Sequence, residues 1–207
     1  MEQNDAQQEL AFIRKVMADS RRVTVENGLD YIVWGAIVAL GMFSTYALDR
    51  LHTTDRVGGG WIYLALWIAV MGGGWVFSLI RYLRGCRSSR VTTLAGRMLG
   101  TIWLACGIAI MLLIFVLGPL GKADPSPAIA VVLGIGFFLS GVLMDFAALR
   151  WASICWWAGA VVLALIHSLP LEMLVFGGMM IAFQVVPGII LHRAWREKAR
   201  SGDETRV

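Results

Sequence analysis

The sequence is short of charged residues and of cysteine, and each shortage argues against a class of protein. Only 15% of the 207 residues are charged, whereas 58% are hydrophobic. A soluble domain has about a quarter of its residues charged, and a core of this size cannot bury such an apolar excess. The excess therefore predicts that lipid covers the chain. The three cysteines, an odd number with two of them in apolar segments, argue against a disulfide scaffold.

Catalytic and cofactor motifs are lacking too. The sequence has no nucleophile elbow, P-loop, His-Glu-x-x-His or dinucleotide fingerprint. Ten methionines and nine tryptophans are present, but methionine as a gap-filler and tryptophan at membrane interfaces account for them. We therefore expect no enzyme activity, no catalytic residue, no cofactor and no metal site. Residues 1–28 also lack the apolar stretch of a secretory signal.

What the sequence does have is long apolar segments. Spanning the hydrocarbon takes about 20 apolar residues in a helix, and turn-forming glycines and prolines separate segments of this kind. The prediction is an all-α polytopic membrane bundle of six transmembrane helices. The segments are 29–48, 60–82, 98–118, 127–148, 151–168 and 171–192.

Charge indicates how these spans are oriented. Six spans place 15 of the 18 Lys and Arg residues on one side of the membrane and three (Arg50, Arg56 and Lys122) on the other. The side rich in Lys and Arg is expected to be cytoplasmic. We therefore expect a multi-pass protein of a plasma membrane, the cell inner membrane of a bacterium, with both termini in the cytoplasm. The net charge of +4 fits this pattern better than specific nucleic-acid binding.

The chain divides into three predicted parts. Residues 1–26 form an amphipathic cytoplasmic helix, in which Leu10, Ile13 and Met17 recur at helical spacing and are candidates for docking a partner. Residues 27–193 form the transmembrane domain, and residues 194–207 a basic cytoplasmic tail. The segments Leu10–Lys15 and Tyr31–Gly35 resemble small bacterial membrane proteins, a resemblance that implies no activity.

The six spans also suggest three two-helix hairpin repeats. An early glycine marks the odd spans (Gly35, Gly107 and Gly159), and a pair of small or helix-breaking residues lies late in each even span. Repeats of this kind would be related by an axis along the membrane normal. Glycines and aromatic residues are common in any transmembrane helix, so the alternative is that the spans are not repeats.

A few polar or helix-weakening residues lie inside the spans. Asp145 is costly in lipid unless paired, so it is either a functional site or the ion-pair partner of Arg150 or Arg81. Gln184 with Pro187 either lines a solute path or is a kink satisfied by a neighbouring helix. Three successive glycines, Gly72, Gly73 and Gly74, indicate a hinge or a close helix crossing. His167 and Glu172, which flank Pro170, are expected to be solvated loop residues rather than a proton-responsive pair.

Two functions remain open for such a protein. The first is a non-enzymatic interaction or regulatory module, whose partners are the lipid bilayer and either a cytoplasmic protein or further copies of the chain. The alternative is a transporter or channel for ions or small solutes, with a path near Asp145 and Gln184. The shortage of ionisable groups in the spans favours the first, because such groups usually mark transport paths.

Overall fold

The computed structural model describes residues 28–51, 60–87, 94–117 and 124–204, and every element in these ranges is a helix. Six helical spans are long and apolar enough to cross a membrane, the last being the continuous run 169–197. The predicted all-α bundle with six spans is therefore confirmed. The elements are α2 (Gly28–Arg50), α3 (Gly60–Arg87), α4 (Leu94–Leu112), η2 (Leu113–Leu117), α6 (Ser126–Leu143), α7 (Ala147–Leu165), α8 (Leu169–Met180), η3 (Ile181–Val185) and α9 (Val186–Glu204).

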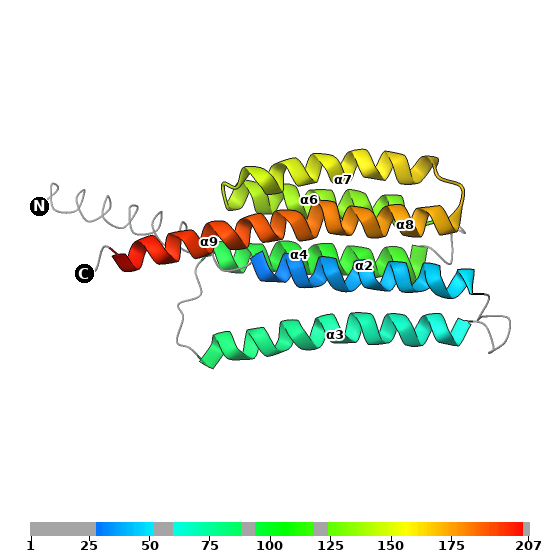
Figure 1. The fold of residues 1–207 in the computed structure, drawn as a ribbon, viewed down its shortest axis with the longest axis horizontal. Helices are drawn as coiled ribbons and strands as arrows, with labels where there is room; N and C mark the ends of the chain where they lie inside the picture. Colours follow the sequence, from blue (N-terminus) through cyan, green and yellow to red (C-terminus); the bar gives the residue numbers. More distant parts are fainter. Residues whose placement is uncertain (1–27, 52–59, 88–93, 118–123, 205–207) are drawn as a thin grey trace, which may run out of the picture.

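Helix α2 organises the bundle. It packs on α3 and along the whole last span of α8, η3 and α9, whereas α6 and α7 form a tight hairpin and α4 packs on α6. Figure 1 shows α3 at the edge of the bundle, beside α2. Only 6% of the α3 span is buried inside the chain, compared with 44% of the α6 span. Most of the α3 span is therefore left uncovered by the other described residues.

Two predicted helix boundaries were wrong. The fourth span was expected to reach residue 148, but α6 ends at Leu143, and α7 begins at Ala147 rather than 151. The reason is a three-residue turn that the apolar residues on both sides conceal. Beyond residue 192 the last span continues as the helix α9, which ends at Glu204. The predicted amphipathic helix lies outside the described residues.

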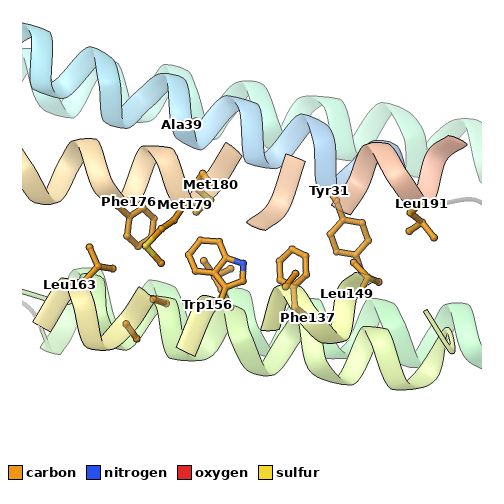
Figure 2. Close-up of a cluster of buried hydrophobic side chains, with 14 of the residues drawn as sticks. Tyr31, Ala39, Phe137, Leu149, Trp156, Leu163, Phe176, Met179, Met180 and Leu191 are labelled. Atoms are coloured by element: carbon orange, nitrogen blue, oxygen red, sulfur yellow. The ribbon is translucent and has the colours of Figure 1, made fainter. Parts of the chain in front are cut away.

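A layer of aromatic side chains fills the centre of the bundle. Trp156, Phe137 and Phe176 are all fully buried. The ring centroid of Trp156 lies 6.4 Å from that of Phe137 and 5.9 Å from that of Phe176. Figure 2 shows these rings between the α6–α7 pair and the α2–α8 pair, with Met179 and Met180 beside them. The centre is a packed apolar core, joined by contacts between offset and edge-on rings.

Glycines bring α2 and α9 into backbone contact at one end of the bundle. A Cβ atom on Gly28 would lie 2.7 Å from the backbone nitrogen of His192, and one on Gly188 would lie 2.9 Å from Tyr31 Cβ. Neither site has room for a side chain. Small residues commonly allow this closeness between transmembrane helices, because lipid removes the hydrophobic drive and packing takes its place.

The three glycines of the predicted repeat have different surroundings. Gly35 and Gly159 lie against side chains of the last span, whereas no atom lies within 4 Å of a Cβ on Gly107. Helix α7 also packs far more closely on α6 than on α8, its partner in the predicted third hairpin. The closest helix pairs therefore do not follow the hairpin units, and the repeat stays a prediction.

Candidate functional site

Gln184 lies in the interior of the bundle, at the contact between the last span and α2. Only 5% of its surface is exposed. Gly35 of α2 makes room for it, since a Cβ there would lie 3.1 Å from Gln184 Cγ. The amide oxygen Oε1 is buried without a hydrogen-bond partner among the described residues. An unpaired buried amide oxygen costs about 1–3 kcal/mol, so this position needs a structural or functional explanation.

The helix around Gln184 changes its hydrogen-bond pattern. Residues Ile181–Val185 form the π-helical turn η3, and the Val186 N–H donates to the Ile181 carbonyl five residues earlier. Pro187, which is buried, has no N–H to donate. The π turn therefore lies immediately before the residue that breaks the regular ladder. Such single π turns are rare and occur frequently at functional sites.

Asp145 lies in the turn between α6 and α7 rather than inside a span. Its φ of 46° is positive, which makes it the only such non-glycine residue among those described. The Phe146 N–H donates to the Gly141 carbonyl at 2.9 Å, and the Asp145 N–H donates to the Val142 carbonyl at 3.2 Å. This is the Schellman arrangement that closes a helix, with Asp145 at the left-handed position. Its role in the backbone explains why a polar residue interrupts the apolar sequence there.

The Asp145 carboxylate forms an ion pair with Arg150, one of the two partners considered from the sequence. The distance from Arg150 Nη1 to Asp145 Oδ1 is 3.0 Å, and 93% of the Asp145 side chain is exposed. The other arginine, Arg81 of α3, pairs instead with Asp30 of α2 at 3.3 Å. Each pair lies at the arginine-rich end of the bundle. An exposed pair of this kind contributes little to stability.

The glycine triplet lies inside α3, which continues through it as a regular helix. A Cβ on Gly74 would lie 2.8 Å from the Trp34 ring of α2, but one on Gly72 or Gly73 would meet nothing within 4 Å. The triplet therefore makes one close helix crossing, through its last member. The other two glycines have no contact within the described chain that requires them.

The polar and glycine positions singled out from the sequence do not converge on one site. Asp145 lies at one end of the bundle, whereas Gln184 lies against one side of α2. The glycines of α3 lie across α2 from Gln184, because α2 runs between α3 and the last span (Figure 1). The candidate docking residues Leu10, Ile13 and Met17 lie outside the described residues. No solute path is assembled by these residues together.

A buried hydrogen-bond cluster joins three spans and was not predicted. The indole Nε1 of Trp103 on α4 lies 3.3 Å from the Tyr31 hydroxyl of α2 and 3.2 Å from Ser140 Oγ of α6. Tyr31 and Ser140 are buried. Nothing in the sequence predicted that these three side chains meet. Their polar atoms satisfy one another, which is how hydroxyl and indole groups usually hold membrane helices together.

Glu172 corrects an expectation, because it is not a solvated loop residue. It lies in the first turn of α8 and is only 7% exposed, whereas His167 is exposed. Its carboxyl group interacts with the side chains of Asp124 and Ser126, and the Ser126 N–H and hydroxyl donate to Asp124 Oδ1 at 3.1 and 2.9 Å. Asp124 precedes α6, far away in sequence. Sequence spacing gave no signal for this contact.

A shallow apolar groove of about 690 Å³ lies between α4 and α6. Its walls include Ala105, Cys106 and Ala109 of α4 and Ile135 of α6, and Arg97 lies among the lining residues. No feature of the sequence predicted this groove.

Similarity to known proteins adds nothing to this picture. No protein-family model, no curated protein and no solved structure matches the chain at a significant level.

Proposed function

We propose that the chain is a non-enzymatic interaction or regulatory module of the membrane. The observation that carries this proposal is how its intramembrane polar groups are used. Trp34 with Ser78, and Tyr31 with Trp103 and Ser140, form hydrogen bonds between helices. Aromatic rings fill the centre. Polar groups used in this way hold a bundle together, and this use is what we expect of a module that works through contact with partners.

The arginine-rich end supports a cytoplasmic contact surface. The described chain places Arg81, Arg84, Arg97, Arg150 and Arg193 where spans begin or end on this side, whereas the opposite end has Arg50. We propose that the arginine-rich end faces the cytoplasm of a bacterium and lies at its plasma membrane, following the positive-inside rule. The partner is then a cytoplasmic protein that the N-terminal segment docks.

Labelling in intact cells tests this orientation. In a variant whose three cysteines are replaced, His167→Cys introduces a thiol at an exposed position of the end opposite the arginines. An impermeant maleimide added outside is expected to label it. Arg84→Cys, at the arginine-rich end, should react only after the cells are opened. The reverse pattern would overturn the orientation.

A matched pair of variants tests the docking role. Ile13→Glu places a charge on the apolar stripe of residues 1–26, and Gln8→Glu places the same charge off the stripe. Both are compared with the full chain by cross-linking in cells, followed by purification in mild detergent. Cytoplasmic proteins that are lost with Ile13→Glu and kept with Gln8→Glu support docking by the stripe. Equal capture by all three chains would exclude it.

A transporter or channel is the second candidate, and one observation favours it. The buried Oε1 of Gln184 has no partner among the described residues and lies in a π turn before Pro187. A polar solute or ion passing this point would supply the missing partner. Proton and potassium flux into proteoliposomes, abolished by Gln184→Leu, would support transport. Equal flux through the native chain and this variant, at the level of empty vesicles, would exclude a path for these ions at Gln184.

A further inference from the structure

The groove between α4 and α6 is shallow, open and almost entirely apolar. Its one hydroxyl group, on Thr101, already donates to the Arg97 carbonyl at 2.9 Å. At about 690 Å³ the groove has the size of a typical small-molecule site. A groove of this kind in a membrane span offers shape and apolar contact, but no polar specificity along its walls.

Small side chains create the groove. Ala105 and Ala109 lie one turn apart on α4, and Ala105 is exposed. Deeper in the same interface α4 and α6 touch closely, since a Cβ on Gly136 would lie 3.2 Å from Cys106 Sγ. The two helices are therefore held together behind the groove.

Arg97 gives the groove a positive charge at one end. It lies near the start of α4, at the arginine-rich end of the bundle, and is exposed. Arg81 and Arg150 pair with Asp30 and Asp145. Within the described ranges no carboxylate lies within ion-pair distance of the Arg97 guanidinium. No carboxylate of the described residues therefore neutralises the charge beside the groove.

We propose that this groove binds one anionic phospholipid, with an acyl chain along Ala105 and Ala109 and the phosphate at Arg97. An apolar slot that ends in a cation at the level where a span begins matches both parts of such a lipid. Basic pockets between transmembrane helices recognise anionic headgroups in this way. The site does not depend on the docking role proposed for residues 1–26.

Charge and shape favour a lipid over a second copy of the chain in this groove. A twofold dimer brings the same surface of both copies together. Two concave grooves would then face each other and leave a gap between them. The two Arg97 side chains would also meet at the same depth, and like charges brought together at an interface are unfavourable.

Native mass spectrometry of the full chain in mild detergent tests the proposal, with phosphatidylglycerol and phosphatidylcholine as probes. The native chain is expected to retain one phosphatidylglycerol in preference to phosphatidylcholine. Arg97→Gln should weaken retention of phosphatidylglycerol about fivefold, the effect of losing one cation at a lipid surface, and should abolish the preference. Arg84→Gln, which removes an exposed arginine of α3 at the same end, is the matched control and should leave both unchanged.

A groove-filling variant separates the acyl chain from the headgroup. Because Ala105 is exposed, the fold accommodates Ala105→Leu, and this variant should have the same melting temperature as the native chain. It should nevertheless bind both lipids more weakly. Equal retention of phosphatidylglycerol by Arg97→Gln and Arg84→Gln would overturn the proposal. A dimer of the native chain that Ala105→Leu converts to monomers would also overturn it, because a second copy would then occupy the groove.

Discussion

The indole Nε1 of Trp34 on α2 donates a hydrogen bond of 3.0 Å to Ser78 Oγ on α3. The same indole ring lies over Gly74, one turn earlier on α3, and Asp30 pairs with Arg81 one turn later. These contacts lie along one face of α3, the helix with the least packing inside the chain. Because α3 packs mainly on α2, its position in the bundle depends on this row of contacts.

Gly74→Ala is expected to weaken the attachment of α3. The added methyl group would lie 2.8 Å from the Trp34 ring, and overpacking of this kind costs about 1–3 kcal/mol. Gly73→Ala is the matched control, since its methyl group meets nothing within 4 Å and replacing a helical glycine gains about 0.5–1 kcal/mol. Unfolding free energies of both variants in mixed detergent micelles check this. Equal stabilities would contradict the crossing described here.

Gly188→Ala is expected to be more damaging than Gly74→Ala. Its methyl group would lie 3.0 Å from the backbone nitrogen of Ile32 as well as against Tyr31, and backbone atoms cannot rotate away. The α2–α9 contact would open, and the melting temperature should fall. Gly178→Ala, in the same span, meets no atom within 4 Å and should melt like the native chain or slightly higher. A larger loss for Gly178→Ala would show that this face contacts another protein.

Asp145 is expected to matter for its backbone rather than its charge. Because its φ is 46°, Asp145→Gly should keep or raise stability, and Asp145→Val should lower it by about 1–2 kcal/mol. Asp145→Asn removes the ion pair with Arg150 but tolerates the left-handed conformation, so it should cost less than about 1 kcal/mol. Thermal melting of the three variants measures this order. If Asp145→Asn lowered the stability as much as Asp145→Val does, the carboxylate itself would have a structural role.

Much of the fold could be predicted from sequence because it depends on local composition. A run of about 20 apolar residues is long enough to cross the membrane as a helix, so the six spans followed from hydropathy. The Asp145–Arg150 pair was also accessible, since its two members are five residues apart. The end of α6 was not predicted, because the Schellman turn that ends it has Asp145 at the position where a glycine usually marks such a turn.

The candidate sites were harder to predict because a residue's role depends on what faces it. Gly74 and Gly178 are both glycines inside a span, yet a Cβ on Gly74 would meet the Trp34 ring and one on Gly178 would meet no atom of the described chain. Glu172 lies beside Asp124 and Ser126, which are far away in the sequence. The groove between α4 and α6 likewise depends on how two helices cross. These contacts depend on the tertiary structure, and they cannot be predicted from the pattern of a single sequence.

Gln184→Met separates the two candidate functions. Methionine has a similar volume and length, and it removes an amide oxygen that is buried without a partner among the described residues. If the chain is an interaction module, the variant should have the same melting temperature as the native chain or a higher one. Its free energy of unfolding should rise by up to about 1–3 kcal/mol, and it should keep its protein partners. Leu163→Met, at a buried apolar position of α7, is the control for adding methionine to the core.

A destabilised Gln184→Met beside a stable Leu163→Met would show that the amide holds a bound polar group, such as water or an ion, inside the span. That outcome would favour the transporter over the module, because an interior that binds polar species is what a path requires.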